Sequence, residues 1–341
     1  MKIGISIGVS PRETFDRFVG LVRAADETAL DAVWVVDSHL IMKDATVALT
    51  LGVQATRRLR FGIGVGNPVT RHPTVYASTF ASLQELSGGR MLLGMGSGDS
   101  AVFPLGLRPA RLAEMESVVQ TLRTLAAGGA VTLNGRSVAL AMPPSRVPVY
   151  VAASQPKMLA LAGRLADGVI VMGPADPAFA AGQIRTVRDA AAAAGRPAGK
   201  PFVDLWVTVS VRDDHAAAVD DVRSWASAQA RWLDSFATLP ASLERHRDAL
   251  HASAREYDFR HHLSVGAEHS RRTVSDALAE ALAVAGDAAT CAARLEALAA
   301  VGPDRMTLTL LSGGRESRLR TLAADVVPRL TASAGAHAAH A

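Results

Sequence analysis

Eight short apolar runs, each followed by a stretch with helical spacing, constrain this sequence more than any other feature. The predicted strands are 2–9, 32–36, 59–65, 91–95, 147–152, 167–172, 202–211 and 305–310. The predicted helices are 14–28, 45–56, 74–86, 110–127, 155–166, 179–194, 215–229, 287–300 and 316–330. Regular alternation of this kind indicates a parallel sheet covered by helices. Eight strands favour a (β/α)8 TIM barrel, and a doubly wound open sheet is the alternative.

Two breaks in the alternation predict insertions into a single domain that spans 1–330. Residues 131–140 follow the fourth strand and contain an Asn-Gly pair, which is a strong signal for a two-residue hairpin turn. Residues 231–286 follow the seventh strand, and we predict an irregular segment there because no sustained periodicity is present. The tail, 331–341, is predicted to be disordered.

Charge and cysteine content narrow the expected partners. The chain has 36 Lys and Arg against 32 Asp and Glu, without a basic run interleaved with aromatics, so we expect no nucleic-acid partner. We expect no membrane partner either, because no run of about 18 apolar residues occurs. The single cysteine, Cys291, rules out an internal disulfide and a multi-Cys zinc site. We therefore expect a cytoplasmic location and no metal.

The residues after the second predicted strand include an acid and an imidazole. In (β/α)8 barrels the chemistry takes place where strands end and helices begin. Asp37 and His39 are two residues apart, so in an extended chain both side chains point to one side. A carboxylate beside an imidazole can position it for proton transfer. The alternative is a polar pair that satisfies loop backbone.

Glycine-rich segments follow the third and fourth predicted strands. Small residues at Gly64–Asn67 would let a flat ligand lie directly on the backbone, although an ordinary strand-to-helix turn is the alternative. The segment GMGSGDS, 94–100, offers backbone N–H groups and hydroxyls, which can form an anion-binding nest. It is not a dinucleotide fingerprint, because Asp99 stands where the pattern needs glycine.

The fifth predicted strand leads directly into a helix. Ser154 is the predicted N-cap of this helix, and Pro156 lies in its first turn. Helix N-termini of this kind can hold phosphate groups. An ordinary capped helix is the alternative.

Four segments together carry a family resemblance: Asp37-Ser38-His39, GVGNPVTRHP (64–73), GRMLLGMGSGDSAV (89–102) and VPVYVAASQPKMLALAGRLADGVIV (147–171). In these segments the chain resembles the luciferase-like flavoenzyme superfamily. Within it, the chain is similar to the deazaflavin-dependent branch related to methylenetetrahydromethanopterin reductase. The resemblance runs from about 1 to 330 and is weakest over 231–286.

The resemblance implies that coenzyme F420 binds at the C-terminal ends of the strands, with FMN as the alternative cofactor. The ring would lie on a bulge in the third strand, at a non-prolyl cis peptide between Gly64 and Val65, and its phosphate would contact Ser97, Gly98 and the start of the fifth helix. The residues implied to bind the cofactor are Asp37, Gly64, Val65, Gly66, Asn67, Gly96, Ser97, Gly98, Ser154, Gln155 and Met158. Gln155 stands where the family commonly has Gly, so its side chain would crowd a phosphate or donate its amide to one.

The resemblance further implies that His39 is the acid or base beside the ring, tuned by Asp37. It also implies a homodimer that pairs through helices near the second and third strands. We therefore expect an F420-dependent oxidoreductase that transfers a hydride between the deazaflavin and a small organic substrate. The alternatives are an FMN-dependent luciferase-like monooxygenase and a non-catalytic flavin- or deazaflavin-binding barrel. Residues 231–286 would line the substrate side, with Tyr257 and His261 as candidates.

Overall fold

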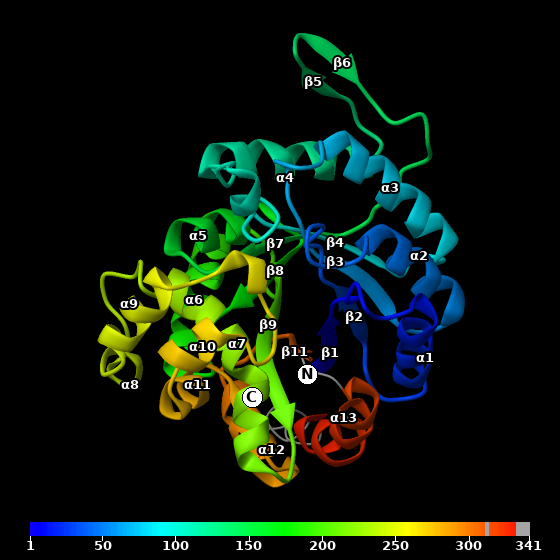
Figure 1. The fold of residues 1–341 in the computed structure, drawn as a ribbon. Coiled ribbons are helices and arrows are strands. Elements are labelled where there is room, and N and C mark those ends of the chain that lie inside the picture. The colour runs from blue at the N-terminus through cyan, green and yellow to red at the C-terminus, as the bar shows by residue number, and fades with distance from the viewer. Residues whose placement is uncertain (311–313, 332–341) are drawn as a thin grey trace.

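Eight parallel strands close into a barrel in the computed structural model, which describes residues 1–310 and 314–331 (Figure 1). The ring runs in chain order, and β8 pairs with β9 on one side while β11 pairs with β1 on the other. The predicted (β/α)8 fold is therefore confirmed. The barrel strands are β1 (Lys2–Ile7), β2 (Ala32–Val35), β3 (Arg60–Gly66), β4 (Met91–Met95), β7 (Val149–Ala153), β8 (Gly168–Met172), β9 (Phe202–Val211) and β11 (Arg305–Thr309).

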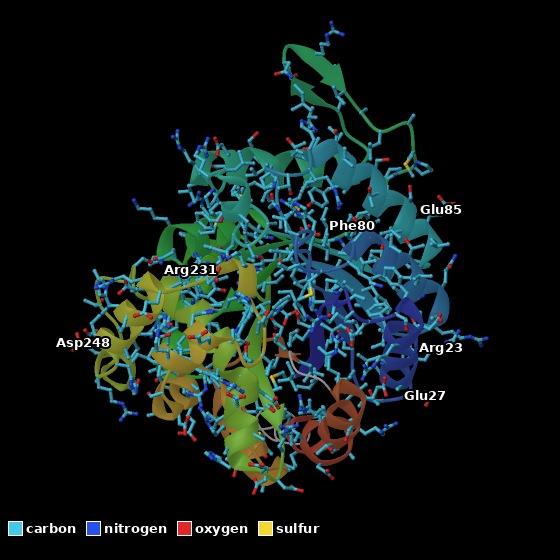
Figure 2. The ribbon with its side chains drawn as sticks, viewed as in Figure 1. Arg23, Glu27, Phe80, Glu85, Arg231 and Asp248 are labelled. Carbon is cyan, nitrogen blue, oxygen red and sulfur yellow. The ribbon has the colours of Figure 1, made fainter. Side chains whose placement is uncertain are left out.

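Helices surround the barrel and bury its outer face. Several of them begin directly after an aspartate whose side chain accepts a first-turn N–H, as Asp44, Asp176 and Asp214 do, which sets the boundary. Phe80 is fully buried on the inner side of its helix and is labelled in Figure 2. The helices are α1 (Phe15–Asp26), α2 (Ala45–Ala55), α3 (Pro73–Leu86), α4 (Leu112–Ala126), α5 (Pro156–Leu165), α6 (Pro177–Ala193), α7 (His215–Leu233), α12 (Ala288–Ala299) and α13 (Arg315–Thr321), and α13 continues through a π-helical turn, η3 (Leu322–Val326).

The predicted hairpin is confirmed. It consists of β5 (Val131–Leu133) and β6 (Arg136–Val138), joined by Asn134 and Gly135, both of which have positive φ. Positive φ at both central residues is the requirement of the tight hairpin turn that an Asn-Gly pair favours. In Figure 1 the hairpin extends away from the barrel beyond α3 and α4.

The prediction that residues 231–286 form an irregular segment is wrong, because this region is mainly helical. Its helices are only four to nine residues long, which is too short for a sustained periodic pattern in the sequence. They pack against α7 around a second apolar core. The elements are α8 (Ala241–Glu244), α9 (Arg247–Arg255), a 3-10 turn η2 (Phe259–His261), α10 (Glu268–Thr273), α11 (Asp276–Leu282) and the short strand β10 (Val284–Gly286), which pairs with β9.

The predicted tail lies outside the described residues except for Thr331, which is helical. The single-domain division of 1–330 stays a prediction. Among residues 1–310 and 314–331, no helix combines the length and the hydropathy needed to cross a lipid bilayer.

Large aromatic side chains fill the barrel interior, and glycines on the strands make room for them. Trp34 packs against Trp206 and Tyr150, with ring centroids 5.7 and 5.4 Å apart. A Cβ on Gly62 would overlap the ring of Trp34, and a Cβ on Gly64 would lie 2.5 Å from the ring of Trp206. These glycines are therefore required by interior packing, whatever ligand lies above them.

A buried ion pair lies at the N-terminal end of the barrel interior. Arg305 donates to the carboxylate of Asp204 at 3.1 Å, and the same carboxylate accepts from Trp34 Nε1 at 3.0 Å and from Thr307 Oγ1 at 2.7 Å. Arg305 also pairs with Asp31, so both the cation and its acidic partners are satisfied. Because these side chains fill the N-terminal end of the barrel, the candidate site lies at the C-terminal ends of the strands.

Candidate functional site

A cavity of about 330 Å³ lies at the C-terminal ends of the strands. One wall consists of the residues at the ends of β2, β3, β4, β7, β8 and β11. The other wall consists of α7, η1 (Phe103–Leu105) and the residues after η2. Trp206, from inside the barrel, lies at the boundary between the packed interior and the cavity.

Most of the residues predicted to bind a cofactor line this cavity. They are Asp37, Gly64, Val65, Gly66, Asn67, Gly96, Ser97, Gly98 and Ser154. Gln155, Met158 and His39 are not among its lining residues within the described part of the chain. The structure therefore brings nine of the predicted cofactor-binding residues together at one cavity. The roles predicted for these nine, and for Gln155, Met158 and His39, stay predictions.

The end of β3 has the predicted cis peptide between Gly64 and Val65, inside an irregularity in the pairing of β3 with β4. The turn after it is held by Asn67, whose side-chain oxygen accepts from the backbone N–H of Val69 and of Thr70 at 3.1 and 3.0 Å. Asn67 is itself buried, so this turn presents a fixed backbone surface to the cavity.

The loop after β4 has features of an anion-binding nest. The backbone N–H groups of Ser97 and Gly98 make no hydrogen bond to another described residue. Gly98 has φ +104°, and a Cβ there would lie 2.6 Å from Val102, so only glycine fits. The loop is tied to the end of β2 by the hydroxyls of Ser38 and Ser100, which are 2.7 Å apart. Two unpaired N–H donors on a loop that is held in place in this way can bind an anionic oxygen.

The predicted cap of the helix after β7 is wrong. The N-cap of α5 is Gln155, not Ser154, and no side chain caps the first turn. The reason is that Pro156 is the first helical residue, which places the half-helical position one residue later than predicted. The Gln155 side chain is exposed and donates to Ser235 Oγ at 2.9 Å, so it neither crowds the cavity nor enters it.

Asp37 and His39, the predicted catalytic pair, occupy different environments. Asp37 lines the cavity, and burial raises the pKa of its carboxyl above the ordinary value despite the opposing charge of Arg71. His39 lies in the following turn with its side chain exposed. The turn breaks the extended geometry on which the shared-face prediction depended.

A face of α7 that sequence reasoning missed forms much of the second wall. Trp225, Ala228, Gln229 and Trp232 follow the i, i+3, i+4, i+7 spacing of one helical face, and all four line the cavity. The signal was present in the sequence, but the predicted helix ended at Gln229 and so excluded the last turn. Arg231, in that last turn, is labelled in Figure 2.

Arg231 joins the loop after β4 to the segment around η2. It forms an ion pair with Asp99, whose carboxyl has a pKa raised by burial in spite of this partner. Its guanidinium also lies over three aromatic rings, 5.5 Å from Phe103, 5.3 Å from Tyr257 and 4.8 Å from Phe259. The cation is thus enclosed by one carboxylate and three ring faces.

The histidine that faces the cavity is His262 rather than its predicted neighbour. His261 is exposed, and its Nδ1 lies 3.1 Å from Asp258. His262 is only 7% exposed and lines the cavity, with Nδ1 hydrogen bonded to the hydroxyl of Tyr257. The sequence could not separate two adjacent histidines, because their directions depend on a 3-10 turn that ends between them.

Three buried polar atoms of residues that line the cavity have no hydrogen-bond partner among the described residues. They are the indole N–H of Trp206, the side-chain oxygen of Gln229 and Nε of Arg231; Trp206 and Gln229 are 6% and 3% exposed. Buried polar groups are normally paired, so unpaired donors and an unpaired acceptor at one cavity fit a ligand that has both N–H and C=O groups. In residues 1–310 and 314–331 no three His, Cys, Asp or Glu side chains are grouped as metal ligands.

Known proteins resemble this chain over most of its length. The family described as luciferase-like monooxygenase matches residues 1–305. A 5,10-methylenetetrahydromethanopterin reductase from Methanolobus tindarius is 31% identical over 215 residues, which are 61% of this chain. The chain spans 65% of the length of that relative, which is just under two thirds.

Two further proteins that resemble this chain are named for coenzyme F420. An F420-dependent glucose-6-phosphate dehydrogenase from Beutenbergia cavernae is 33% identical over 248 residues, covering 66% of this chain and 74% of that protein. The structure of a coenzyme F420 dependent tetrahydromethanopterin reductase from Methanopyrus kandleri superposes with a TM-score of 0.79 at 22% identity. It covers 97% of this chain and 100% of its own.

Proposed function

This chain belongs to the luciferase-like monooxygenase family, and from that membership we propose that it is an F420-dependent oxidoreductase acting on a small organic substrate. Two of the similar proteins are named for F420, one a dehydrogenase and the other a reductase. Both names describe two-electron redox chemistry. The proposal extends that chemistry, but not the substrates of those proteins, to this chain.

The observation that carries the proposal is the convergence of three backbone segments on one cavity. The end of β3, the glycine-rich loop after β4 and the end of β7 all line it, and together they present little but backbone and small side chains. A flat ring needs such a surface, because a larger side chain would hold it away from the strand ends.

The residues present fit this cofactor. Bound F420 supplies a ring carbon, C5, that accepts or gives a hydride. The N–H groups of Ser97 and Gly98 would receive its phosphate, and Gln229 and Trp206 would provide an acceptor and a donor to the polar edge of its ring. This chain's part is to bind, to orient, and to exclude water through the aromatic face of α7.

Equilibrium titration of the purified protein with F420 and with FMN tests the proposal. We expect F420 to bind more tightly than FMN, and reduced F420 to be consumed or produced under anaerobic conditions when a substrate is present. Tighter binding of FMN, with oxidation that consumes dissolved oxygen, would establish the monooxygenase alternative instead. Binding without turnover of any tested substrate would favour the non-catalytic barrel.

We also propose the homodimer and the cytoplasmic location that the sequence analysis predicted. Exposed apolar side chains near the starts of α2 and α3 support the dimer, since Leu40, Val47 and Val75 are each 45–48% exposed. Light scattering at micromolar concentration tests this, and a monomer mass would refute it.

The acid–base role of His39 remains a prediction, and its exposed position makes mutation the decisive measurement.

A further inference from the structure

We infer that the substrate part of this cavity binds a neutral, mainly apolar compound and holds its carbonyl or hydroxyl oxygen by a hydrogen bond from Nε2–H of His262. The inference rests on the proposed function, since it assumes that the strand ends hold the cofactor and that the opposite wall faces the substrate. It adds the substrate class and a residue that binds it.

The wall opposite the strand ends is aromatic and apolar. Trp225 and Trp232 come from one face of α7 and Phe103 from η1, and Leu263 directly follows His262. These side chains are separated in sequence by up to 160 residues, so the fold brings apolar surface to this wall from three elements. A ligand that lies against them gains most by burying hydrocarbon.

The cavity offers no positive charge that is not already balanced within the described residues. Arg231 is the one Lys or Arg among the lining residues; its Nη2 pairs with Asp99, and its buried Nε makes no hydrogen bond to a described residue. A phosphorylated or carboxylated substrate would have to share this guanidinium with Asp99, and the rings of Phe103, Tyr257 and Phe259 cover it. Anionic substrates are therefore disfavoured, because a desolvated anion would meet a cation whose charge a carboxylate already balances.

His262 presents a hydrogen-bond donor to the cavity. Its Nδ1 is hydrogen bonded to the hydroxyl of Tyr257. A phenol is the better donor of the two and an imidazole nitrogen the better acceptor, so Tyr257 donates and the imidazole proton resides on Nε2. Nε2 makes no hydrogen bond to another described residue, and His262 lines the cavity. Its N–H is thus free for a ligand oxygen.

The surroundings keep this imidazole neutral. Arg231 faces it from α7, with Asp99 behind that guanidinium, Tyr257 faces it from the residues before η2, and His269 from α10. Burial, together with the charge of Arg231 and of His269, lowers the pKa of His262 to about 3. A neutral imidazole can polarise a carbonyl without being protonated. The hydrogen bond should therefore persist unchanged between about pH 5 and 8.

Binding of two matched probes to the full chain tests the substrate class. Acetophenone is a neutral aromatic ketone, and 4-acetylbenzoate adds only a carboxylate to the same ring. We expect calorimetry to show binding of acetophenone at least tenfold tighter than that of 4-acetylbenzoate. Equal or tighter binding of 4-acetylbenzoate would overturn the inference. The titration is done with and without F420, so a failure of cofactor binding is recognised separately.

The carbonyl stretching frequency of bound, ¹³C-labelled acetophenone tests the role of His262. We expect the band to lie below its position in an apolar solvent, to stay constant from pH 5 to 8, and to return to that position in His262→Leu. His262→Gln, which keeps an N–H near the place of Nε2, should restore part of the shift, and His251→Gln, an exposed histidine on α9, should leave it unchanged. Acetophenone affinity should fall about three- to tenfold in His262→Leu.

Tyr257→Phe is the second variant, in case His262→Leu does not fold. Without the phenol, the imidazole proton is free to reside on either nitrogen, so the carbonyl band should split or shift less than in the wild type. A carbonyl frequency that is identical in the wild type and in every folded His262 and Tyr257 variant would refute the hydrogen bond.

Discussion

Replacement of Gln229 by Met should have opposite effects on the free protein and on its cofactor complex. Gln229 lies on the cavity face of α7, is 3% exposed, and has a side-chain oxygen without a hydrogen-bond partner among the described residues. Met has nearly the same length and shape but no amide, and its thioether sulfur is only a weak acceptor. The variant therefore removes the unpaired acceptor without leaving a hole.

The magnitude follows from the unpaired group. A buried polar group without a partner costs about 1–3 kcal/mol, so removing it should raise the free energy of unfolding of the cofactor-free protein by about 1 kcal/mol. In the wild type, the bound cofactor gives the Gln229 oxygen a hydrogen-bond partner, which removes the cost of leaving it unpaired. The variant cannot make this hydrogen bond, so cofactor binding no longer gains this free energy. Cofactor affinity should therefore fall by about 1–3 kcal/mol, or roughly 5- to 150-fold in Kd.

Two measurements on the same samples separate these effects. Chemical denaturation without cofactor gives the change in stability, and fluorescence titration with F420 gives the change in affinity. Gln120→Met, at an exposed position on α4, controls for the chemical change alone and should alter neither value. A Gln229→Met protein that is less stable but binds F420 normally would refute the reasoning, because its amide would then serve the fold and not the ligand.

Three further outcomes follow from residues described above. Gly62→Ala should destabilise the fold by about 1–3 kcal/mol, because its methyl group would overlap Trp34, whereas Gly182→Ala on α6 meets no atom within 4 Å and should be neutral or stabilising in denaturant titrations. Burial would raise the pKa of Asp31, but ion pairs with two basic side chains hold it below the ordinary value. This carboxylate therefore adds stability above about pH 4 that is lost as the pH falls, and denaturation at pH 7 and pH 3 should show a smaller loss for Asp31→Asn than for the wild type. His39→Ala should lower turnover less than about tenfold, since the side chain is exposed, and a loss of about 10²–10⁴ would instead support its predicted acid–base role.

The barrel was predictable because its strands are buried on both faces. Such strands read as continuous apolar runs, and β4 and β9 were predicted to the residue. The helices after α7 were not predictable in the same way. Their apolar positions face a second core that is assembled from short pieces far apart in sequence, so no single window shows a period.

The candidate site was predictable where backbone defines it and not where side-chain direction does. The strand-end rule located Asp37 and the glycine-rich loop after β4, both of which line the cavity. It could not show that His39 is exposed or that His262, rather than His261, faces inward. Those directions depend on a turn in each case, and a turn follows from long-range packing more than from the residues within it.

The close packing of Gly64 against Trp206 also limits the order in which substitutions at these two positions can occur. A side chain at position 64 would occupy space that the indole of Trp206 already fills, with only 2.5 Å from a Cβ to the ring. A larger residue at 64 is therefore accessible only with or after a smaller one at 206, so the two positions are epistatic. Because Trp206 also borders the cavity, each permitted double substitution changes the depth of the cavity while the outer helices stay as they are. Variation in ligand size within such a barrel would then proceed through paired replacements of this kind and not through single ones.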